Sequence, residues 1–253
     1  MSAMDEFQKK VSEIVSGVSG FPKQPAKGYK CPACKDMGWI PVTDSQGYPC
    51  LRECRCMAME KAKCRLERSG ISREFTAKSF DNFDTRDIGQ LVTAVNKAKC
   101  YCRDFLQAEN TRHNSIIFSG QSGAGKTHLG MAICNWLLGR QVAVVYMEYR
   151  NAVTKLKQQA MDGQAYQGGI SRYSSARVLY IDDLLKGKAT ESDVNILYEI
   201  VNYRYMNNLP MVISTEKSLE ELMEFDEAIG GRIIEMCIKS LVTLKGKELN
   251  YRF

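Results

Sequence analysis

The sequence lacks any apolar run long enough to cross a membrane. A membrane-spanning helix needs roughly 20 consecutive apolar residues, and no run in the 253 residues approaches that length. The N-terminal region, where Asp5 and Glu6 stand close to Lys9 and Lys10, also has no apolar core of a secretory signal peptide. These absences argue against membrane-spanning and exported proteins, and we expect a cytoplasmic protein with no membrane partner.

The sequence also has little excess of charge of either sign. Its formal net charge is +6, with 44% hydrophobic and 25% charged residues, as is typical of a packed globular protein. A mild positive excess suits a nucleic-acid partner, but it is equally common in proteins that bind none. The length is enough for one ordinary α/β domain and a smaller appendage.

Cysteine is abundant, and half of it is clustered. Five of the ten cysteines lie between Cys31 and Cys56, and without a signal peptide this clustering favours a metal site over disulfides. The pair Cys31 and Cys34 forms a C-x-x-C knuckle, and a second group about 20 residues later completes a four-thiolate zinc site, which is structural because no position stays open for water. Cys54 and Cys56 are the preferred partners, and Cys50 is an alternative for one place. Unliganded thiols and a redox pair are less favoured readings, since no βαβ pattern surrounds the knuckle.

One stretch has the pattern of a phosphate-binding loop. Residues 116–120 have β character, residues 128–138 carry apolar side chains at helical spacing, and the segment between them fits G-x-x-x-x-G-K-[ST]. The glycines let successive backbone N–H groups point at the β- and γ-phosphates. We expect Lys126 to reach these phosphates and Thr127 to hold Mg²⁺, against the alternative of a glycine-rich turn that binds nothing. The predicted nucleotide-binding residues are Gly120, Gln121, Ser122, Gly123, Ala124, Gly125, Lys126, Thr127 and His128.

The nucleotide is expected to be ATP. A guanine-reading N-K-x-D motif is missing from the sequence, and Asn96-Lys97-Ala98-Lys99 comes closest without fitting. GTP is therefore the less favoured nucleotide.

Two later strands end in polar residues suited to phosphate chemistry. Residues 177–183 form an apolar strand that ends in Asp182 and Asp183. In a phosphate-loop protein the first carboxylate holds the water shell of Mg²⁺ and the second orients or activates the attacking water. Residues 210–215 form another strand, so Ser214 or Thr215 is positioned to sense the γ-phosphate, or else to cap the following turn.

The remaining pattern divides the chain into residues 1–70 and 71–253, the latter opening with a linker and leading helix over 71–110. Residues 162–175 are polar with three glycines and predict a loop, and Gly230-Gly231 predicts the start or interruption of a helix. Ser218 to Glu221 reads as a capping box, and the tail after 244 leaves no room for a helical lid. The expected helices are 4–16, 57–68, 85–109, 128–138, 148–160 and 190–207, and the expected strands are 116–120, 142–147, 177–183, 210–215 and 240–244.

Taken in order, these motifs resemble the DnaC/DnaI-type helicase loaders of bacteria and phages. The resemblance covers nearly the whole chain and rests on the cysteine module, Ser69-Gly70-Ile71, Ser79-Phe80-Asp81-Asn82-Phe83, the phosphate loop through Leu129, Ile181-Asp182-Asp183-Leu184, Ser218-Leu219-Glu220-Glu221-Leu222 and Arg232-Ile233. It implies an AAA+ ATPase domain with a central five-stranded parallel sheet and a zinc module that engages the hexameric replicative helicase. It also implies ATP-dependent loading of that helicase onto single-stranded DNA and self-association through the ATPase domain.

The resemblance also assigns roles by position. Lys126 and Thr127 correspond to Walker A, Asp182 and Asp183 to Walker B, and Thr215 to a sensor. Two arginines complete the set: Arg232 corresponds to the arginine finger, supplied to a neighbouring subunit, and Arg252 to the C-terminal arginine that reads nucleotide.

Three features depart from the family pattern. Glu216 stands where the family often has asparagine, Gly230-Gly231 precedes Arg232 where a helix former or serine is commoner, and Cys50 is an additional candidate zinc ligand. Two alternative functions stay open. One is an IstB-type transposition helper with the same ATPase core, and the other is an adaptor that uses nucleotide as a switch with little hydrolysis. A metabolic phosphate-loop kinase is disfavoured, because Arg232 and the zinc module have no role there.

Overall fold

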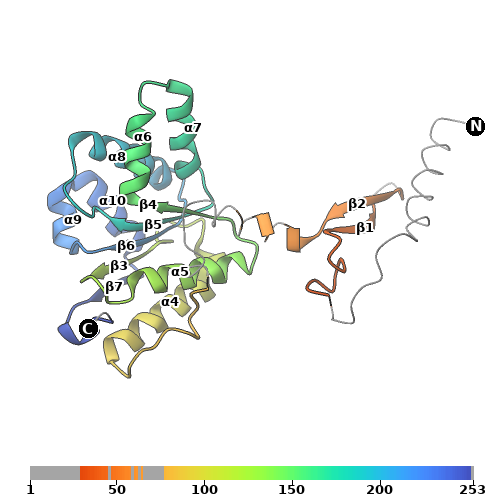
Figure 1. Ribbon diagram of the computed structural model, residues 1–253, viewed down its shortest axis with the longest axis horizontal. Coiled ribbons are helices and arrows are strands. Elements are labelled where there is room, and N and C mark those ends of the chain that lie inside the picture. Colours follow the sequence, from red (N-terminus) through yellow and green to blue (C-terminus); the bar gives the residue numbers. More distant parts are fainter. Residues whose placement is uncertain (1–28, 45–46, 58–59, 62–63, 65–76, 252–253) are drawn as a thin grey trace, which may run out of the picture. The chain divides into compact units, whose positions relative to one another are not determined.

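The computed structural model describes residues 29–44, 47–57, 60, 61, 64 and 77–251 (Figure 1). Two compact units make up the chain, Met1–Cys54 and Arg55–Phe253. The helix expected at 4–16, much of that expected at 57–68, the expected boundary near Gly70 and Arg252 lie outside the described residues. Within the described part of the chain, no helix is long and apolar enough to cross a membrane.

The smaller unit contains an antiparallel hairpin of strands β1 (Trp39–Thr43) and β2 (Pro49–Glu53). At the open end of the hairpin the N–H of Cys54 donates to the Gly38 carbonyl at 2.7 Å. The hairpin thereby carries Cys54 back beside the loop that contains Cys34. Two cysteine groups that are distant in sequence are brought together by this one pair of strands.

The larger unit is built on a parallel sheet of five strands. In sheet order these strands are β4 (Val144–Glu148), β5 (Val178–Leu184), β6 (Met211–Thr215), β3 (Ile116–Gly120) and β7 (Leu241–Leu244). Every neighbouring pair is parallel. The predicted five-stranded parallel sheet is therefore confirmed, and the carboxyl ends of all five strands meet at one edge, where ligands bind in such sheets.

Helices cover both faces of the sheet (Figure 1). Ile116 and Phe118 pack on the side of helices α4 (Gly89–Ala108) and α5 (Lys126–Leu138), whereas Ile117 packs on the opposite side. This alternation follows from the period of two along a strand. The opposite side is covered by α6 (Tyr149–Gln158), α7 (Gly163–Ser174), α8 (Glu191–Met206), α9 (Leu219–Phe225) and α10 (Glu227–Cys237), and a short 3₁₀ turn η1 (Lys247–Leu249) follows β7.

The loop prediction for residues 162–175 is wrong, because helix α7 occupies most of that segment. The Asp162 carboxylate accepts hydrogen bonds from the N–H groups of Gln164 and Ala165 at 3.1 and 3.0 Å, which caps the helix start. Gly169 packs closely against α6, since a Cβ there would lie 2.6 Å from the end of the Leu156 side chain. The glycines that suggested a loop include one that permits a close contact between helices.

A fully buried arginine holds the other end of α7. The Arg204 guanidinium donates hydrogen bonds to the carbonyls of Tyr173, Ser174 and Ala176 and to that of Pro210 just before β6, at 2.6 to 3.1 Å. The last turn of a helix leaves its carbonyls without partners inside the helix, and Arg204 satisfies those of Tyr173 and Ser174. Arg204 thus fastens α7 and β6 to α8, and burial lowers the pKa of its guanidinium to about 9.

Helix α10 runs through the two glycines that were expected to start or interrupt it. A Cβ at Gly230 would lie 2.5 Å from the Leu222 carbonyl oxygen, whereas a Cβ at Gly231 would meet nothing within 4 Å. Gly230 therefore serves the close packing of α9 against α10. The capping box at the start of α9 is confirmed, with Ser218 and Glu221 bonding each other's backbone N–H groups.

Candidate functional site

The phosphate loop has the backbone shape that its glycines predict. Gly120, Gly123 and Gly125 have φ of 141°, 80° and 83°, a region that other residues avoid. A Cβ at Gly120 would lie 2.0 Å from the Leu244 carbonyl oxygen on β7. The loop therefore needs glycine at this position both for its conformation and for the neighbouring strand.

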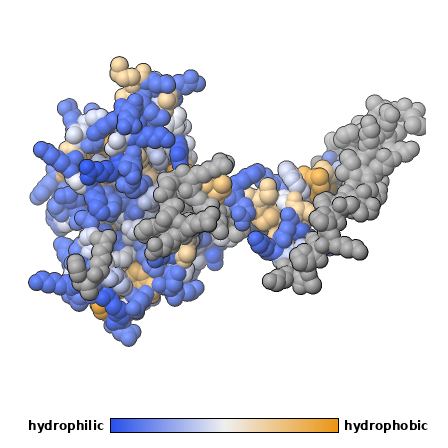
Figure 2. Space-filling view, in the orientation of Figure 1, coloured by the Kyte–Doolittle hydropathy of each residue, from blue (hydrophilic) through white to orange (hydrophobic). Residues whose placement is uncertain are grey.

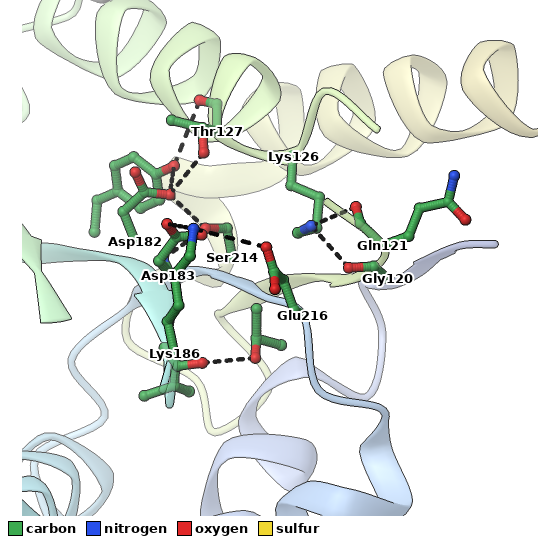
Figure 3. A network of polar contacts seen from close by, with 12 residues as sticks. Gly120, Gln121, Lys126, Thr127, Asp182, Asp183, Lys186, Ser214 and Glu216 are labelled. Carbon is green, nitrogen blue, oxygen red and sulfur yellow. Dashed lines mark hydrogen bonds and ion pairs between the residues drawn. The ribbon is translucent and has the colours of Figure 1, made fainter. Parts of the chain in front are cut away.

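Lys126 begins helix α5 and reaches back over the loop. Its Nζ donates to the carbonyls of Gly120 and Gln121, each at 2.7 Å (Figure 3). Burial lowers the pKa of this ammonium, and the nearby Glu216 and Asp183 carboxylates act in the opposite direction. The Lys126 side chain is thus buried and held against the loop by two of its carbonyls.

Asp182 lies at the centre of a group of hydroxyls. Its Oδ1 accepts hydrogen bonds from Thr127 at 3.0 Å, from Tyr180 at 2.7 Å and from Ser214. Its Oδ2 accepts one from Tyr146 at 3.0 Å. The side chain is only 5% exposed, so these four donors fix the direction of the carboxylate.

The oxygens of Thr127 and Asp182 fit a magnesium site. Two neighbouring ligands of an octahedral Mg²⁺ lie about 3 Å apart, given metal–oxygen distances of about 2.1 Å. The Thr127 hydroxyl and the Asp182 carboxylate lie 3.0 Å apart. Thr127 is in the first turn of α5, and Asp182 is near the carboxyl end of β5. A Mg²⁺ held by these oxygens would neutralise charge on the bound phosphates.

Asp183 follows Asp182 but faces different partners. Its Oδ2 lies 2.6 Å from Nζ of Lys186, which also lies 3.6 Å from Oε1 of Glu216 (Figure 3). The Asp183 backbone is left-handed, with φ of 53°, and its N–H donates to the Ser214 hydroxyl at 3.0 Å. Near the end of β5, where its pairing with β6 is irregular, the Asp182 carboxylate therefore faces the four hydroxyls and the Asp183 carboxylate faces Lys186.

The two sensor candidates on β6 have separate environments. Ser214 contacts the Asp182 carboxylate, whereas the Thr215 hydroxyl donates to the Leu184 carbonyl at 2.8 Å and accepts from the Lys217 N–H at 3.1 Å. Thr215 is fully buried. This geometry favours the turn-capping role that the sequence left open, and the sensor role of Thr215 stays a prediction.

An open cavity of about 580 Å³ lies against the phosphate loop, a size that suits a nucleotide. Lys126, Thr127, Asp183 and Glu216 contribute to one part of its lining. Another part is aromatic, where Phe83 meets His128 edge-on with ring centroids 5.0 Å apart and meets Tyr251 at 5.9 Å. A Cβ at Gly125 would lie 2.7 Å from the Phe83 ring, so the loop and this aromatic wall are in direct contact.

Arg232 lies on α10 and does not line this cavity among the described residues. Its guanidinium donates to the Ala228 carbonyl at 2.9 Å and lies 5.1 and 5.5 Å from the rings of Tyr198 and Tyr205. Its expected role as an arginine finger for a neighbouring subunit stays a prediction, as does the nucleotide-reading role of Arg252.

The four preferred cysteines come together as one group. The sulfurs of Cys31, Cys34, Cys54 and Cys56 all lie within 4.8 Å of one another, and those of Cys31 and Cys54 are 3.7 Å apart. Sulfurs around a tetrahedral zinc are separated by about 3.8 Å, given Zn–S bonds of about 2.3 Å. Cys50 is exposed on β2 and is not part of the group. The arrangement is consistent with a zinc site.

The knuckle itself has the tight backbone that such a site needs. Lys35, Asp36 and Gly38 are left-handed, with φ of 51°, 65° and 80°. The Gly38 N–H donates to Sγ of Cys34 at 3.3 Å, and the Cys31 N–H donates to the Asp36 carboxylate at 2.8 Å. These bonds hold the Cys31 backbone and the Cys34 sulfur within the turn.

Most of the larger unit matches a known family. Residues 58–243 match the model described as IstB-like ATP binding protein. The chain belongs to this family. Two relatives extend the match: the phage-like element PBSX protein XkdC of Bacillus subtilis (strain 168) is 39% identical over 236 residues, 90% of this chain and 87% of that protein. The replicative helicase loader DnaC of Escherichia coli (strain K12) is 30% identical over 187 residues, 73% of this chain and 71% of that protein.

Solved structures show the same fold for this IstB-like protein. The crystal structure of DnaI aligns with a TM-score of 0.56 over 71% of this chain and 94% of that chain, at 22% identity. The crystal structure of the DnaC helicase loader aligns with a TM-score of 0.59 over 69% and 100%, at 18% identity. At these identities the likeness concerns the fold alone. The predicted AAA+ fold class and the family resemblance are confirmed.

Sequence reasoning missed several partners of the predicted site residues. Tyr180 is two positions before Asp182, so a strand places both side chains on one face, and this signal was available. Tyr146 pairs with Tyr180 across β4 and β5, which only the strand register reveals. Lys186 was missed because its position depends on the left-handed turn that contains Asp183 and Leu185.

Proposed function

We propose that this IstB-like protein is an ATP-dependent loader of a hexameric replicative DNA helicase onto single-stranded DNA. The observation that carries the proposal is the presence, in one chain, of a candidate nucleotide site and a four-cysteine cluster. The nucleotide site has the Thr127 hydroxyl 3.0 Å from Asp182, and the four cysteines lie outside the residues that match the family model. A relative at 30% identity is named a replicative helicase loader, which supports this assignment.

In the proposed reaction, Lys126 and the loop N–H groups bind the β- and γ-phosphates of ATP. Thr127 and Asp182 would hold Mg²⁺, which would neutralise charge on the phosphates, and Asp183 orients the attacking water. An arginine supplied by a neighbouring copy of the chain, Arg232, neutralises charge on the transferred phosphoryl group. The hydrolysis is slow in isolation, because it needs this second subunit.

The small unit offers a surface suited to a protein partner. Apolar side chains are exposed on and beside its hairpin, among them Met37 at 59%, Trp39 at 46% and Leu51 at 64%. Hydrophilic residues predominate on the visible face of the larger unit, whereas the hairpin region shows more apolar surface (Figure 2). Exposed apolar residues that gather in this way mark interaction sites more often than isolated ones do. We assign this surface to the helicase.

The decisive experiment mixes the purified full-length chain with the hexameric helicase from the same genome, with ATP, and measures the mass of the complex by size-exclusion chromatography with light scattering. Co-elution that is lost in the Trp39→Ser/Leu51→Ser variant supports the loader function. Separate elution of the two proteins, or a complex that survives this substitution unchanged, counts against it.

A transposition helper ATPase of the IstB type is the second candidate, because the family model itself carries that name. Such a protein would act with a transposase on duplex DNA. Binding of duplex over single-stranded DNA in the presence of ATP, measured by fluorescence anisotropy, would favour it. Preference for single strands, with the salt dependence that phosphate contacts impose, would favour the loader.

A further inference from the structure

A second lysine, Lys186, stands in the nucleotide cavity beside Lys126. It belongs neither to the phosphate loop nor to the Asp182-Asp183 pair, and the sequence motifs give it no role. Its ammonium lies between two carboxylates, 2.6 Å from Asp183 and 3.6 Å from Glu216 (Figure 3). The lining of this cavity includes three lysines and three acids, which are Lys78, Lys126, Lys186, Asp84, Asp183 and Glu216.

The turn that carries Lys186 is built to hold it there. Asp183, Leu185 and Gly187 are all left-handed, with φ of 53°, 58° and 91°, and the Lys186 N–H donates to the Asp183 carbonyl at 3.0 Å. The Leu185 side chain is only 3% exposed and anchors the middle of the turn in the core. A buried leucine thus fixes the backbone on which the Lys186 side chain pivots, while that side chain stays 45% exposed and able to move.

The acidic residues of the cavity create a need for a further cation near the terminal phosphate. The carboxylates of Asp183 and Glu216 repel a triphosphate, whose terminal phosphate must lie close to Asp183 if that residue is to orient water. Lys126 is engaged by the carbonyls of Gly120 and Gln121, and the charges of Glu216, Asp183 and Lys186 all act on it. A cation on the Asp183 side of the cavity is what a terminal phosphate requires there.

We propose that Lys186 is a second phosphate-binding lysine, whose ammonium exchanges between the Asp183 and Glu216 carboxylates and the γ-phosphate of bound ATP. This inference rests on the proposed ATP-dependent function. In the exchange, Lys186 releases Asp183 to orient water at the moment when the terminal phosphate is present. Lys186 thereby distinguishes ATP from ADP, since ADP has no phosphate at that position to draw the ammonium away.

The test compares the affinities of Mg²⁺-β,γ-methylene-ATP and Mg²⁺-ADP by isothermal titration calorimetry. A hydrogen bond between charged groups contributes enough to change affinity by about tenfold to a hundredfold. Lys186→Gln is expected to lower the preference for the triphosphate by at least about tenfold and to change ADP affinity little. Lys186→Arg is expected to keep much of the preference. The control is Lys188→Gln, which removes the same charge from an exposed residue of the same segment.

A double-mutant cycle tests the exchange itself. In the chain with Lys186, Asp183→Asn removes a competitor for the ammonium and should raise triphosphate affinity; in the Lys186→Gln background that gain should shrink. A preference for triphosphate that is the same in Lys186→Gln and in the unchanged chain would overturn the inference, as would strictly additive effects in the cycle. Failure of the proposed function has a different signature, in which the unchanged chain binds neither nucleotide or Lys126→Ala leaves both affinities intact.

Discussion

The Thr127 hydroxyl lies 3.0 Å from Oδ1 of Asp182, which joins the first turn of α5 to the end of β5. Two motifs that are far apart in the sequence share this one contact. The contact also orders the site, because Asp182 is held by three further hydroxyls and cannot turn away from Thr127 without breaking those bonds.

Replacing Thr127 by valine should raise the Mg²⁺ concentration needed for half-maximal ATP turnover by about tenfold or more, because valine has the same shape but no hydroxyl ligand. Thr127→Ser keeps the hydroxyl and should behave nearly as the unchanged chain does. Turnover measured across a Mg²⁺ titration checks this. An unchanged Mg²⁺ dependence in Thr127→Val would show that this hydroxyl is no ligand.

Gly130→Ala should disturb the Asp182 carboxylate by displacing Tyr180, one of its hydrogen-bond donors. A Cβ at Gly130 would lie 2.5 Å from the Tyr180 hydroxyl, which donates to Asp182 at 2.7 Å. We expect a loss of about 1–3 kcal/mol in the free energy of unfolding, as overpacking costs, together with lower turnover. Gly139→Ala at the end of the same helix meets nothing closer than 3.4 Å and is the control. Denaturant unfolding and turnover are the measurements, and equal effects of the two substitutions would contradict the prediction.

The chain should bind one zinc through the four clustered cysteines. Cys54→Ser should lose the metal, because three thiolates no longer complete the tetrahedron. Cys50→Ser should retain it, since Cys50 is exposed on β2 and outside the cluster. The measurement is the zinc content of the Cys54→Ser and Cys50→Ser variants by mass spectrometry. Loss of zinc from Cys50→Ser would reassign the fourth ligand.

Arg232→Ala should lower ATP turnover by about a thousandfold or more, which is the contribution of an arginine finger, and should leave ATP affinity unchanged. Because the arginine acts on a neighbouring subunit, mixing Arg232→Ala with Lys126→Ala should restore part of the turnover. In a mixed pair, the Lys126→Ala subunit supplies the arginine, and the Arg232→Ala subunit supplies the intact nucleotide site. The prediction fails if turnover in the mixture is no higher than in the separate variants.

The sequence was sufficient to predict the elements whose structure depends on one local pattern of residues. The strand before Gly120, the strand that ends in Asp182 and the capping box at Ser218 are all where they were expected. It was insufficient where a distant group decided the outcome. Helix α7 contains several glycines, and its end is held by Arg204, a residue on another helix that nothing near residues 162–175 reveals.

For the site, sequence motifs supplied the residues that follow each strand but not their neighbours. Tyr146 reaches Asp182 only because β4 and β5 pair in one register. Lys186 reaches Asp183 because two residues that are not glycine adopt left-handed conformations in the turn. Such conformations are uncommon and cannot be read from residue type.

The buried Arg204 also bears on how the molecule opens. Unfolding of α7 alone would strip a fully buried guanidinium of its bonds to Tyr173, Ser174 and Ala176 while Pro210 still held it in the core. That cost makes separate opening of α7 unfavourable. The amide hydrogens near the end of α7 should therefore exchange with solvent only when the sheet itself unfolds, so this glycine-containing helix belongs to the same cooperative unit as the strands that carry Asp182 and Ser214.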